Sequence, residues 1–265
     1  MEKRKTSNQG LIVQTTSNQS KRNFIFGSRA IIEAIQAGKE IDRLLVQKNL
    51  SNDLINELIN LAKLHKVPLS RVPREKLRKI TSKNHQGAIC FIASIHFSSL
   101  DNVISQCFEG GKDPFLLVLD RITDVRNFGA IVRTAECAGV DGIVIPAKGS
   151  AQIGGDAMKT SAGALNLMPI CRVENLIRSL KLLKDNGLFL IACTEKADDL
   201  IFETKLDQPC ALIFGSEENG ISEEAMQLAN IKAKIPVRGK IGSLNVSVAA
   251  GIAMYEKVRQ VGSSV

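Results

Sequence analysis

The sequence predicts an α/β fold in two domains, the larger one built around a mostly parallel sheet. From residue 115 onward, short apolar runs alternate with segments whose apolar residues recur at helical spacing, a pattern typical of a parallel sheet covered on both faces. A smaller version of this alternation occupies residues 24–95. The expected boundaries are a disordered basic arm at 1–22, a domain at 23–96, a linker rich in Ser, Asp and Gly at 97–113, and a domain at 114–262.

In the smaller domain, Ser28 is placed to cap a helix that runs to Gln36, and Gly38 is placed to end it. Apolar residues from 44 to 47 indicate a strand. The remaining elements expected there are an amphipathic helix over 52–65 and an apolar strand over 87–95.

The larger domain repeats the order strand then helix. Strands are expected at 115–119, 142–145, 188–193, 211–214 and 231–235, and helices near 127–138, 174–185, 222–229 and 245–259. Spacing alone indicates a Rossmann-like sheet. No G-x-G-x-x-G follows an early strand, which disfavours a dinucleotide-dependent oxidoreductase.

The net charge of +8 is unevenly distributed. Residues 1–98 hold seventeen Lys and Arg against seven Asp and Glu, whereas residues 99–265 hold eighteen against twenty. This predicts a polyanion-binding region beside a nearly neutral domain, although a solvated helix face is the alternative interpretation of the basic run at 71–83. With one Tyr and no Trp, base stacking is disfavoured, so phosphate and shape contacts with a folded RNA are expected. The residues expected to bind RNA are Arg29, Arg71, Arg74, Arg78, Lys79 and Lys83.

Composition also limits the location and the cofactor class. No apolar run approaches the roughly 20 residues of a membrane span, and the basic N-terminus lacks the apolar stretch of a signal peptide, so a cytoplasmic protein is expected. A transit peptide is disfavoured by Glu2 and by the lack of an amphipathic pattern. The six cysteines form no C-x-x-C pair and lie mostly in apolar runs, which favours buried free thiols over a zinc site or a disulfide framework.

Three motifs carry the functional signal. A strand-like run ends in a G-x-E-x-x-G loop at 215–220, where glycines permit positive φ and a close backbone approach. The second motif passes from Ile235 and Pro236 to a possible helix cap at 243–245, followed by small apolar residues. The third, at 120–135, again reads as strand, loop and helix.

In this order and spacing the motifs resemble the SpoU (TrmH) family of SPOUT-class methyltransferases, which methylate ribose 2′-hydroxyls in structured RNA. The resemblance covers roughly residues 24 to 260. The start at 26–31 and the tripeptide at 85–87 are closest in layout to the bacterial 23S rRNA guanosine-2′-O-methyltransferases. One departure is visible: the family usually has Asp-Pro before the motif asparagine, whereas Val125 follows Asp124 here, so the loop is less rigidly preset.

The resemblance implies a deep trefoil knot, a ribosomal-protein-like RNA-binding domain, S-adenosyl-L-methionine as cofactor, and a homodimer that takes Arg133 from one subunit and the cofactor loops from the other. The residues it places at the cofactor are Thr194, Gly215, Gly220, Ile235 and Leu244. The catalytic residues it implies are Asn127, Arg133, Glu217, Ser243 and Asn245.

Six of these residues also have a structural interpretation. Arg133 fits a solvent-exposed surface residue. Ile235 and Leu244 fit simple core packing. Glu217 fits a loop support that accepts backbone N–H groups. Ser243 and Asn245 fit helix capping, a role that is compatible with binding a substrate phosphate.

The proton acceptor is not identified. All three histidines, at 65, 85 and 96, precede the larger domain. A guanidinium does not readily deprotonate, so Arg133 is better interpreted as a phosphate clamp that positions the 2′-oxygen. The acceptor stays open between Arg133, a substrate phosphate and water.

The leading hypothesis is methyl transfer from S-adenosylmethionine to a guanosine 2′-hydroxyl of 23S rRNA. Within the same class, a tRNA ribose methyltransferase and an rRNA adenosine methyltransferase stay open. From another class, a non-catalytic RNA-binding assembly factor is the alternative, which the retained Asn127, Arg133, Glu217 and Asn245 disfavour.

Overall fold

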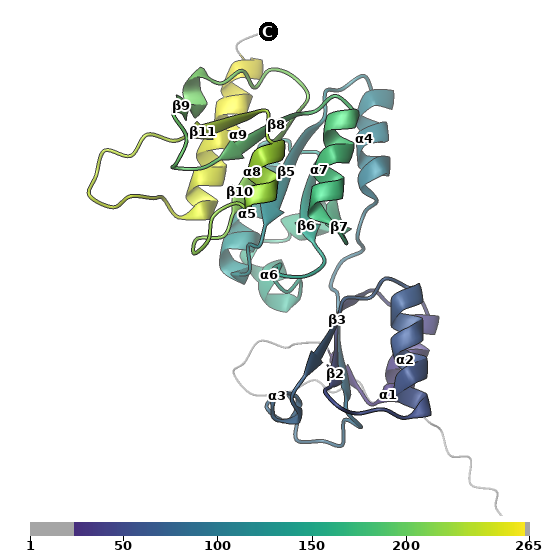
Figure 1. Ribbon diagram of the computed structural model, residues 1–265. Helices are drawn as coiled ribbons and strands as arrows, with labels where there is room; N and C mark the ends of the chain where they lie inside the picture. The colour runs from purple at the N-terminus through teal and green to yellow at the C-terminus, as the bar shows by residue number, and fades with distance from the viewer. Residues whose placement is uncertain (1–23, 263–265) are drawn as a thin grey trace, which may run out of the picture. The chain divides into compact units, whose positions relative to one another are not determined.

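The computed structural model describes residues 24–262, in two compact units that divide between Ser94 and Ile95 (Figure 1). The arm expected at 1–22 lies outside the described residues. None of the helices in the described part is long and apolar enough to cross a membrane.

The first unit is a four-stranded sheet with helices on both faces. Its strand order is β1 (Phe24–Phe26), β4 (Ala88–Ile92), β2 (Ile41–Gln47) and β3 (Leu69–Val72). Only β2 and β3 pair in parallel. Helices α1 (Ser28–Gln36) and α2 (Asp53–Leu64) bury one face, and the short α3 (Arg74–Arg78) inserts Leu77 into the other.

The ends of α1 test the capping predictions. Gly38 has φ 72 and follows the C-cap, so its role as a stop is confirmed. The prediction for Ser28 is wrong, because Gly27 is the N-cap and Ser28 is the buried first residue of the helix. A side chain that is needed inside the core cannot turn outward to cap the helix.

The second unit is a seven-stranded sheet in which every pairing is parallel. Its order is β7 (Ile170–Val173), β6 (Gly142–Pro146), β5 (Phe115–Asp120), β10 (Cys210–Gly215), β8 (Phe189–Cys193), β11 (Ile231–Lys234) and β9 (Asp199–Leu200). The five strands expected from the sequence are all present. Strands β7 and β9 were not predicted.

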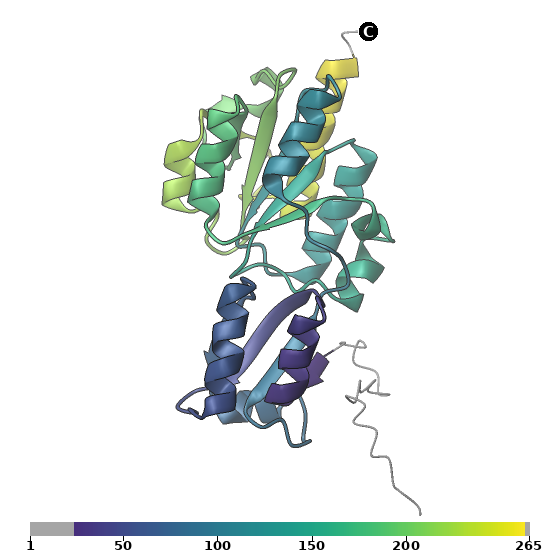
Figure 2. The same cartoon turned by 90° about the vertical axis from the view of Figure 1, so that its right-hand side faces the viewer.

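Helices cover both faces of this sheet (Figures 1 and 2). Along β5, Leu117 and Leu119 face one core cluster, while Leu116 and Val118 face the other, as strand geometry requires. The first face carries α5 (Val125–Cys137), α6 (Gly155–Thr160), α9 (Val246–Gly262) and the 3-10 turns η1 (Ala164–Asn166) and η2 (Ile201–Glu203). The second carries α4 (Leu100–Glu109), α7 (Leu176–Asp185) and α8 (Glu223–Leu228).

Helix α4 occupies most of the stretch at 97–113 that the sequence suggested as a linker. Its residues Leu100, Val103 and Ile104 are buried in the core of the second unit, and the Ser98 N–H donates to the Ile170 carbonyl at 2.9 Å. In the structure this stretch is therefore part of the second unit.

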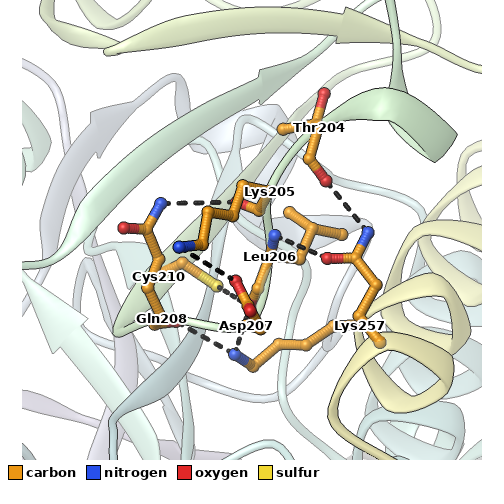
Figure 3. A network of polar contacts seen from close by, with 8 residues as sticks. Thr204, Lys205, Leu206, Asp207, Gln208, Cys210 and Lys257 are labelled. Carbon is orange, nitrogen blue, oxygen red and sulfur yellow. Dashed lines mark hydrogen bonds and ion pairs between the residues drawn. The ribbon is translucent and has the colours of Figure 1, made fainter. Parts of the chain in front are cut away.

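A polar network ties α9 to the segment that precedes β10 (Figure 3). The Lys257 ammonium, 6% exposed, donates to the carbonyls of Leu206 at 2.6 Å and Gln208 at 3.0 Å. The Gln260 side chain donates to the Thr204 carbonyl at 2.9 Å and accepts the Leu206 N–H at 2.8 Å. We call these five residues the α9 clasp.

All six cysteines are free thiols, and four of them are buried. Burial raises the pKa of Cys90 and of Cys171 to about 12, so these thiols stay protonated near neutral pH. The prediction of buried free thiols is confirmed for these four, whereas Cys137 is exposed on α5.

Candidate active site

Three polar side chains from distant parts of the chain meet near the carboxyl ends of β5 and β10. The Asn245 amide donates to the Asn127 oxygen at 3.0 Å and to Glu217 Oε1 at 2.8 Å. The Asn127 amide donates to the same Glu217 oxygen at 2.9 Å. We call these residues the amide–carboxylate cluster. Two amide donors converge on one carboxylate oxygen, which fixes its position, while the second oxygen accepts no hydrogen bond from residues 24–262.

Asn127 is set by the start of α5. The Asp124 carboxylate accepts the N–H groups of Arg126 at 2.8 Å and Asn127 at 2.9 Å, which caps the helix. Val125 occupies the first helical position, where proline is favourable but not required. The Asp124 cap therefore fixes the backbone at Asn127 even though this chain lacks the Asp-Pro dipeptide that is usual in the family.

Gly129 allows α5 to lie close against α6. A Cβ at this position would meet Thr160 Oγ1 at 2.0 Å and Thr160 Cβ at 2.7 Å. The Thr160 hydroxyl is itself held by the Asp156 carbonyl at 2.9 Å. Gly129 thus fixes the position of the helix end that carries Asn127.

Asn245 has two structural roles at once. Its oxygen caps α9 by accepting the Ser247 N–H at 2.9 Å and the Ser247 hydroxyl at 2.6 Å. Its amide nitrogen reaches Asn127 and Glu217. Helix capping is therefore confirmed for Asn245, and the same residue links the start of α9 to the cluster.

The loop that carries Glu217 is closed by its own backbone. Gly220, at φ 65, donates its N–H to the Ser216 carbonyl at 2.8 Å. A Cβ on Gly215 would lie 2.0 Å from the Gly220 carbonyl carbon, so only glycine fits there. Glu217 was expected to accept backbone N–H groups of this loop, but its recorded donors are the two asparagine side chains.

Arg133 does not join the cluster of its own chain. It follows Asn127 by six residues, which places it about 120° away around α5 and roughly 9 Å further along. Its side chain is exposed and makes no hydrogen bond or ion pair with any residue between 24 and 262. Ser243 is also exposed, without a side-chain hydrogen bond in that range.

The residues expected at the cofactor follow three neighbouring strands. Thr194 comes directly after β8, Gly215 ends β10 with Gly220 in its loop, and Ile235 follows β11. Ile235 is half-buried against the core, so the packing interpretation holds for it as well. Leu244 is 38% exposed at the end of the long loop between β11 and α9 (Figure 1).

This set fits S-adenosylmethionine in its chemistry. The cofactor has no phosphate, and the loops contain no phosphate-binding glycine fingerprint. Exposed Leu244, Val237 and Ile241 offer apolar side chains, and the carboxylates of Glu217 and Glu218 suit a cationic sulfonium. Within the described residues there is no group of three or more His, Cys, Asp or Glu that could hold a metal.

All six residues expected to bind RNA are exposed on the first unit. Burial lowers the pKa of His85, and the positive charges of Arg74 and Arg78 lower it further, which indicates that both arginines lie near His85. His85 Nδ1 accepts the Gly87 N–H at 3.1 Å, which orders the turn before β4. The basic residues of α3 and this turn form an open surface for a polyanion.

Comparison with known proteins agrees with this architecture. Residues 114–255 match the model of the SpoU rRNA Methylase family, and residues 24–98 match that of the RNA 2′-O ribose methyltransferase substrate-binding domain. A putative TrmH family tRNA/rRNA methyltransferase of Bacillus subtilis, YacO, is 32% identical over 91% of this chain and 96% of its own length. One from Staphylococcus aureus is 36% identical over 89% of this chain and 95% of its own.

A solved structure supports the fold. The SpoU methyltransferase AviRb from Streptomyces viridochromogenes, in complex with AdoMet, has a TM-score of 0.58 at 24% identity and covers 91% of both chains. The chain belongs to the SpoU methylase (TrmH) family. It is an RNA 2′-O-methyltransferase that uses S-adenosylmethionine as methyl donor.

Two neighbours of the cluster were not singled out from the sequence. Asp120 is the last residue of the apolar strand β5, Arg121 follows it, and both contact the loop that carries Glu217. A buried aspartate at the carboxyl end of a strand was a usable signal, because an unpaired carboxylate is rarely buried.

Proposed function

We propose that this enzyme methylates the ribose 2′-hydroxyl of a guanosine in 23S rRNA. The observation that carries the proposal is the amide–carboxylate cluster, located where the cofactor residues gather, in a chain whose first unit holds the exposed basic residues. When bound, S-adenosylmethionine supplies an electrophilic methyl group. The protein must then hold the 2′-oxygen in line with that group and accommodate the proton that leaves.

The residue roles follow from their surroundings. Arg133 clamps a substrate phosphate and positions the 2′-oxygen, because a guanidinium is a fork of donors and a poor base. Asn127 and Asn245 fix the Glu217 carboxylate, and the start of α9 offers N–H groups to a phosphate. The proton passes to a substrate phosphate or to water.

We propose a homodimer in which Arg133 completes the site of the other subunit. Two observations support this arrangement. Arg133 is exposed and lies about 120° around α5 from Asn127, and the outer side of α9 carries apolar residues: Val248 and Tyr255 are about half exposed, opposite the buried face. Exposed apolar residues opposite the buried face of a helix are typical of a side that a partner covers.

Mixing two inactive variants tests the shared site. After Arg133→Ala and Glu217→Ala proteins are dissociated and reassembled, each heterodimer has one site with both residues intact. Random pairing should therefore restore activity at about a quarter of all sites. Activity near background after confirmed subunit exchange would rule out the shared arrangement.

The family resemblance further suggests that α9 threads a loop as a trefoil knot, and that the enzyme works in the cytoplasm, where bacterial rRNA is found. The α9 clasp is compatible with threading, since it ties α9 to the segment before β10.

The substrate is tested by transfer of a labelled methyl group to rRNA that lacks native modification, followed by mapping of the modified ribose. Modification of one guanosine in 23S rRNA is the expected result. Relatives named as tRNA/rRNA methyltransferases make tRNA the second candidate, so it is assayed in parallel. Methylation of tRNA alone, or of an rRNA adenosine, would replace the proposed substrate.

A further inference from the structure

A charged pair, with a buried aspartate and a partly exposed arginine, lies at the end of β5, outside the cluster. Asp120 is 3% exposed, and its Oδ2 accepts the Ser222 N–H at 2.6 Å. The adjacent Arg121 donates from Nη2 to the Gly220 carbonyl at 3.1 Å. Arg121 Nε lies 3.3 Å from Asp120 Oδ1, which is an ion pair without hydrogen-bond geometry.

These contacts fix the far end of the loop that carries Glu217. Its near end is fixed because Gly215 belongs to β10, which pairs with β5 through Gly215 and Asp120. At its far end, Gly220 and Ser222 are hydrogen-bonded by the Arg121 and Asp120 side chains, and Ile221 between them packs against the core. Glu217 therefore lies on a short span anchored at both ends.

The backbone supports a dedicated role for Arg121. It has φ 61, a left-handed conformation that a non-glycine residue adopts only where its surroundings require it. The chain bends at Arg121, directly after β5. The residue in this conformation is the one whose side chain contacts Gly220 in the loop after β10.

We propose that Asp120 and Arg121 are positioning residues for methyl transfer: by holding Gly220 and Ser222 they keep Glu217 against Asn127 and Asn245. The inference rests on the proposed role of Glu217. Neither residue needs to touch the substrate. Without the two anchors the loop relaxes, and the carboxylate no longer meets both amides.

Rates of methyl transfer at saturating cofactor test the proposal. Arg121→Met removes the donor to Gly220 and keeps much of the side-chain volume. It should lower kcat by about 10- to 100-fold, the loss expected for a displacement near 1 Å, and leave KM for RNA within about twofold. Arg121→Lys restores a donor and should recover part of the loss. Arg178→Met, at an exposed position of α7, is the matched control and should keep the wild-type rate.

Asp120 provides an independent variant if Arg121→Met folds poorly. Asp120→Asn keeps an oxygen for the Ser222 N–H and should retain more activity than Asp120→Ala. Equal rates for both Asp120 variants and wild type would overturn the role of the carboxylate.

A double-mutant cycle separates positioning from a general structural effect. In a Glu217→Ala background, Arg121→Met should cause little further loss of kcat, because its effect passes through Glu217. An equal loss in both backgrounds would overturn the proposal. If Glu217→Ala lowers the rate and Arg121→Met does not, only the positioning role fails. If Glu217→Ala keeps the wild-type rate, the proposed site fails, and the positioning role fails with it.

Discussion

Replacing Lys257 by methionine should destabilise the second unit by removing the centre of the α9 clasp. Methionine keeps an unbranched apolar stem but cannot donate a hydrogen bond. The carbonyls of Leu206 and Gln208 would then lose the donor they share. Leu206 is fully buried, so water cannot easily take the place of the ammonium.

The size of the effect follows from two opposing contributions. Hydrogen bonds from a charged donor each contribute about 1.5–3 kcal/mol, so losing two costs about 3–6 kcal/mol. Against this, the variant no longer buries an ammonium, and the methionine side chain packs near Phe115, whose ring lies 5.2 Å from the Lys257 nitrogen. We expect a net loss of about 2–4 kcal/mol, which lowers Tm by roughly 5–15 °C in a unit of this size.

Equilibrium urea unfolding followed by circular dichroism measures this loss for the transition of the second unit. Lys181→Met, on the exposed side of α7, is the matched control because it removes the same group from a solvated position. Its free energy of unfolding should stay within about 0.5 kcal/mol of wild type.

An unchanged or higher stability of the Lys257→Met variant would refute the reasoning. It would mean that the cost of burying the ammonium equals or exceeds what its two hydrogen bonds contribute. The clasp would then be a geometric feature without a net stabilising role.

Three further predictions concern RNA, protons and catalysis. Arg74→Gln combined with Arg78→Gln should reduce the magnitude of the slope of log K for RNA against log salt by about 1.4–1.8, as the loss of two phosphate contacts requires; an unchanged slope would make these residues a solvated surface. Burial, and then the charges of Arg74 and Arg78, lower the pKa of His85 in the folded state. The contribution of neutral His85 to the free energy of unfolding is therefore complete above the unfolded-state pKa of 6.5. That contribution is lost as the pH falls through the lower folded-state pKa. Wild type should therefore lose more Tm than His85→Gln between about pH 8 and pH 5, and equal losses would contradict this. Arg133→Ala should abolish methyl transfer but leave the affinity for the cofactor product nearly unchanged in calorimetric titration; a parallel fall in affinity would make it a pocket or folding residue.

Much of the fold was predictable from local patterns. The expected strands and helices of the second unit are present, because the strands are apolar runs or, in β11, alternate apolar and polar residues, and the helices have apolar residues at helical spacing. Helix α4 was missed for an instructive reason: Ser99 and Gly110, which suggested a linker, are the N-cap and C-cap of this helix. Strand β9, with two residues, is too short to show any period.

The site was only partly predictable. The motifs identified Asn127, Glu217 and Asn245 one by one, but no local pattern shows that residues 118 positions apart share a hydrogen bond. Asp120 and Arg121 begin the motif at 120–135 but were assigned no role, because their partners lie 102 and 99 positions away. Such contacts depend on the order of strands in the sheet, which sequence spacing does not specify.

The order of strands in the seven-stranded sheet has a consequence for how the protein folds during its synthesis. Strand β5 is central and entirely buried, yet its neighbour β10 pairs Cys210 with Phe115 across a long stretch of chain. While a ribosome is still synthesising the intervening segments, β5 lacks this neighbour, and an apolar strand with an unpaired edge favours aggregation. Pairings so distant in sequence also form slowly. Yield during expression is therefore expected to depend on temperature and on chaperones more strongly than the stability of the finished fold suggests.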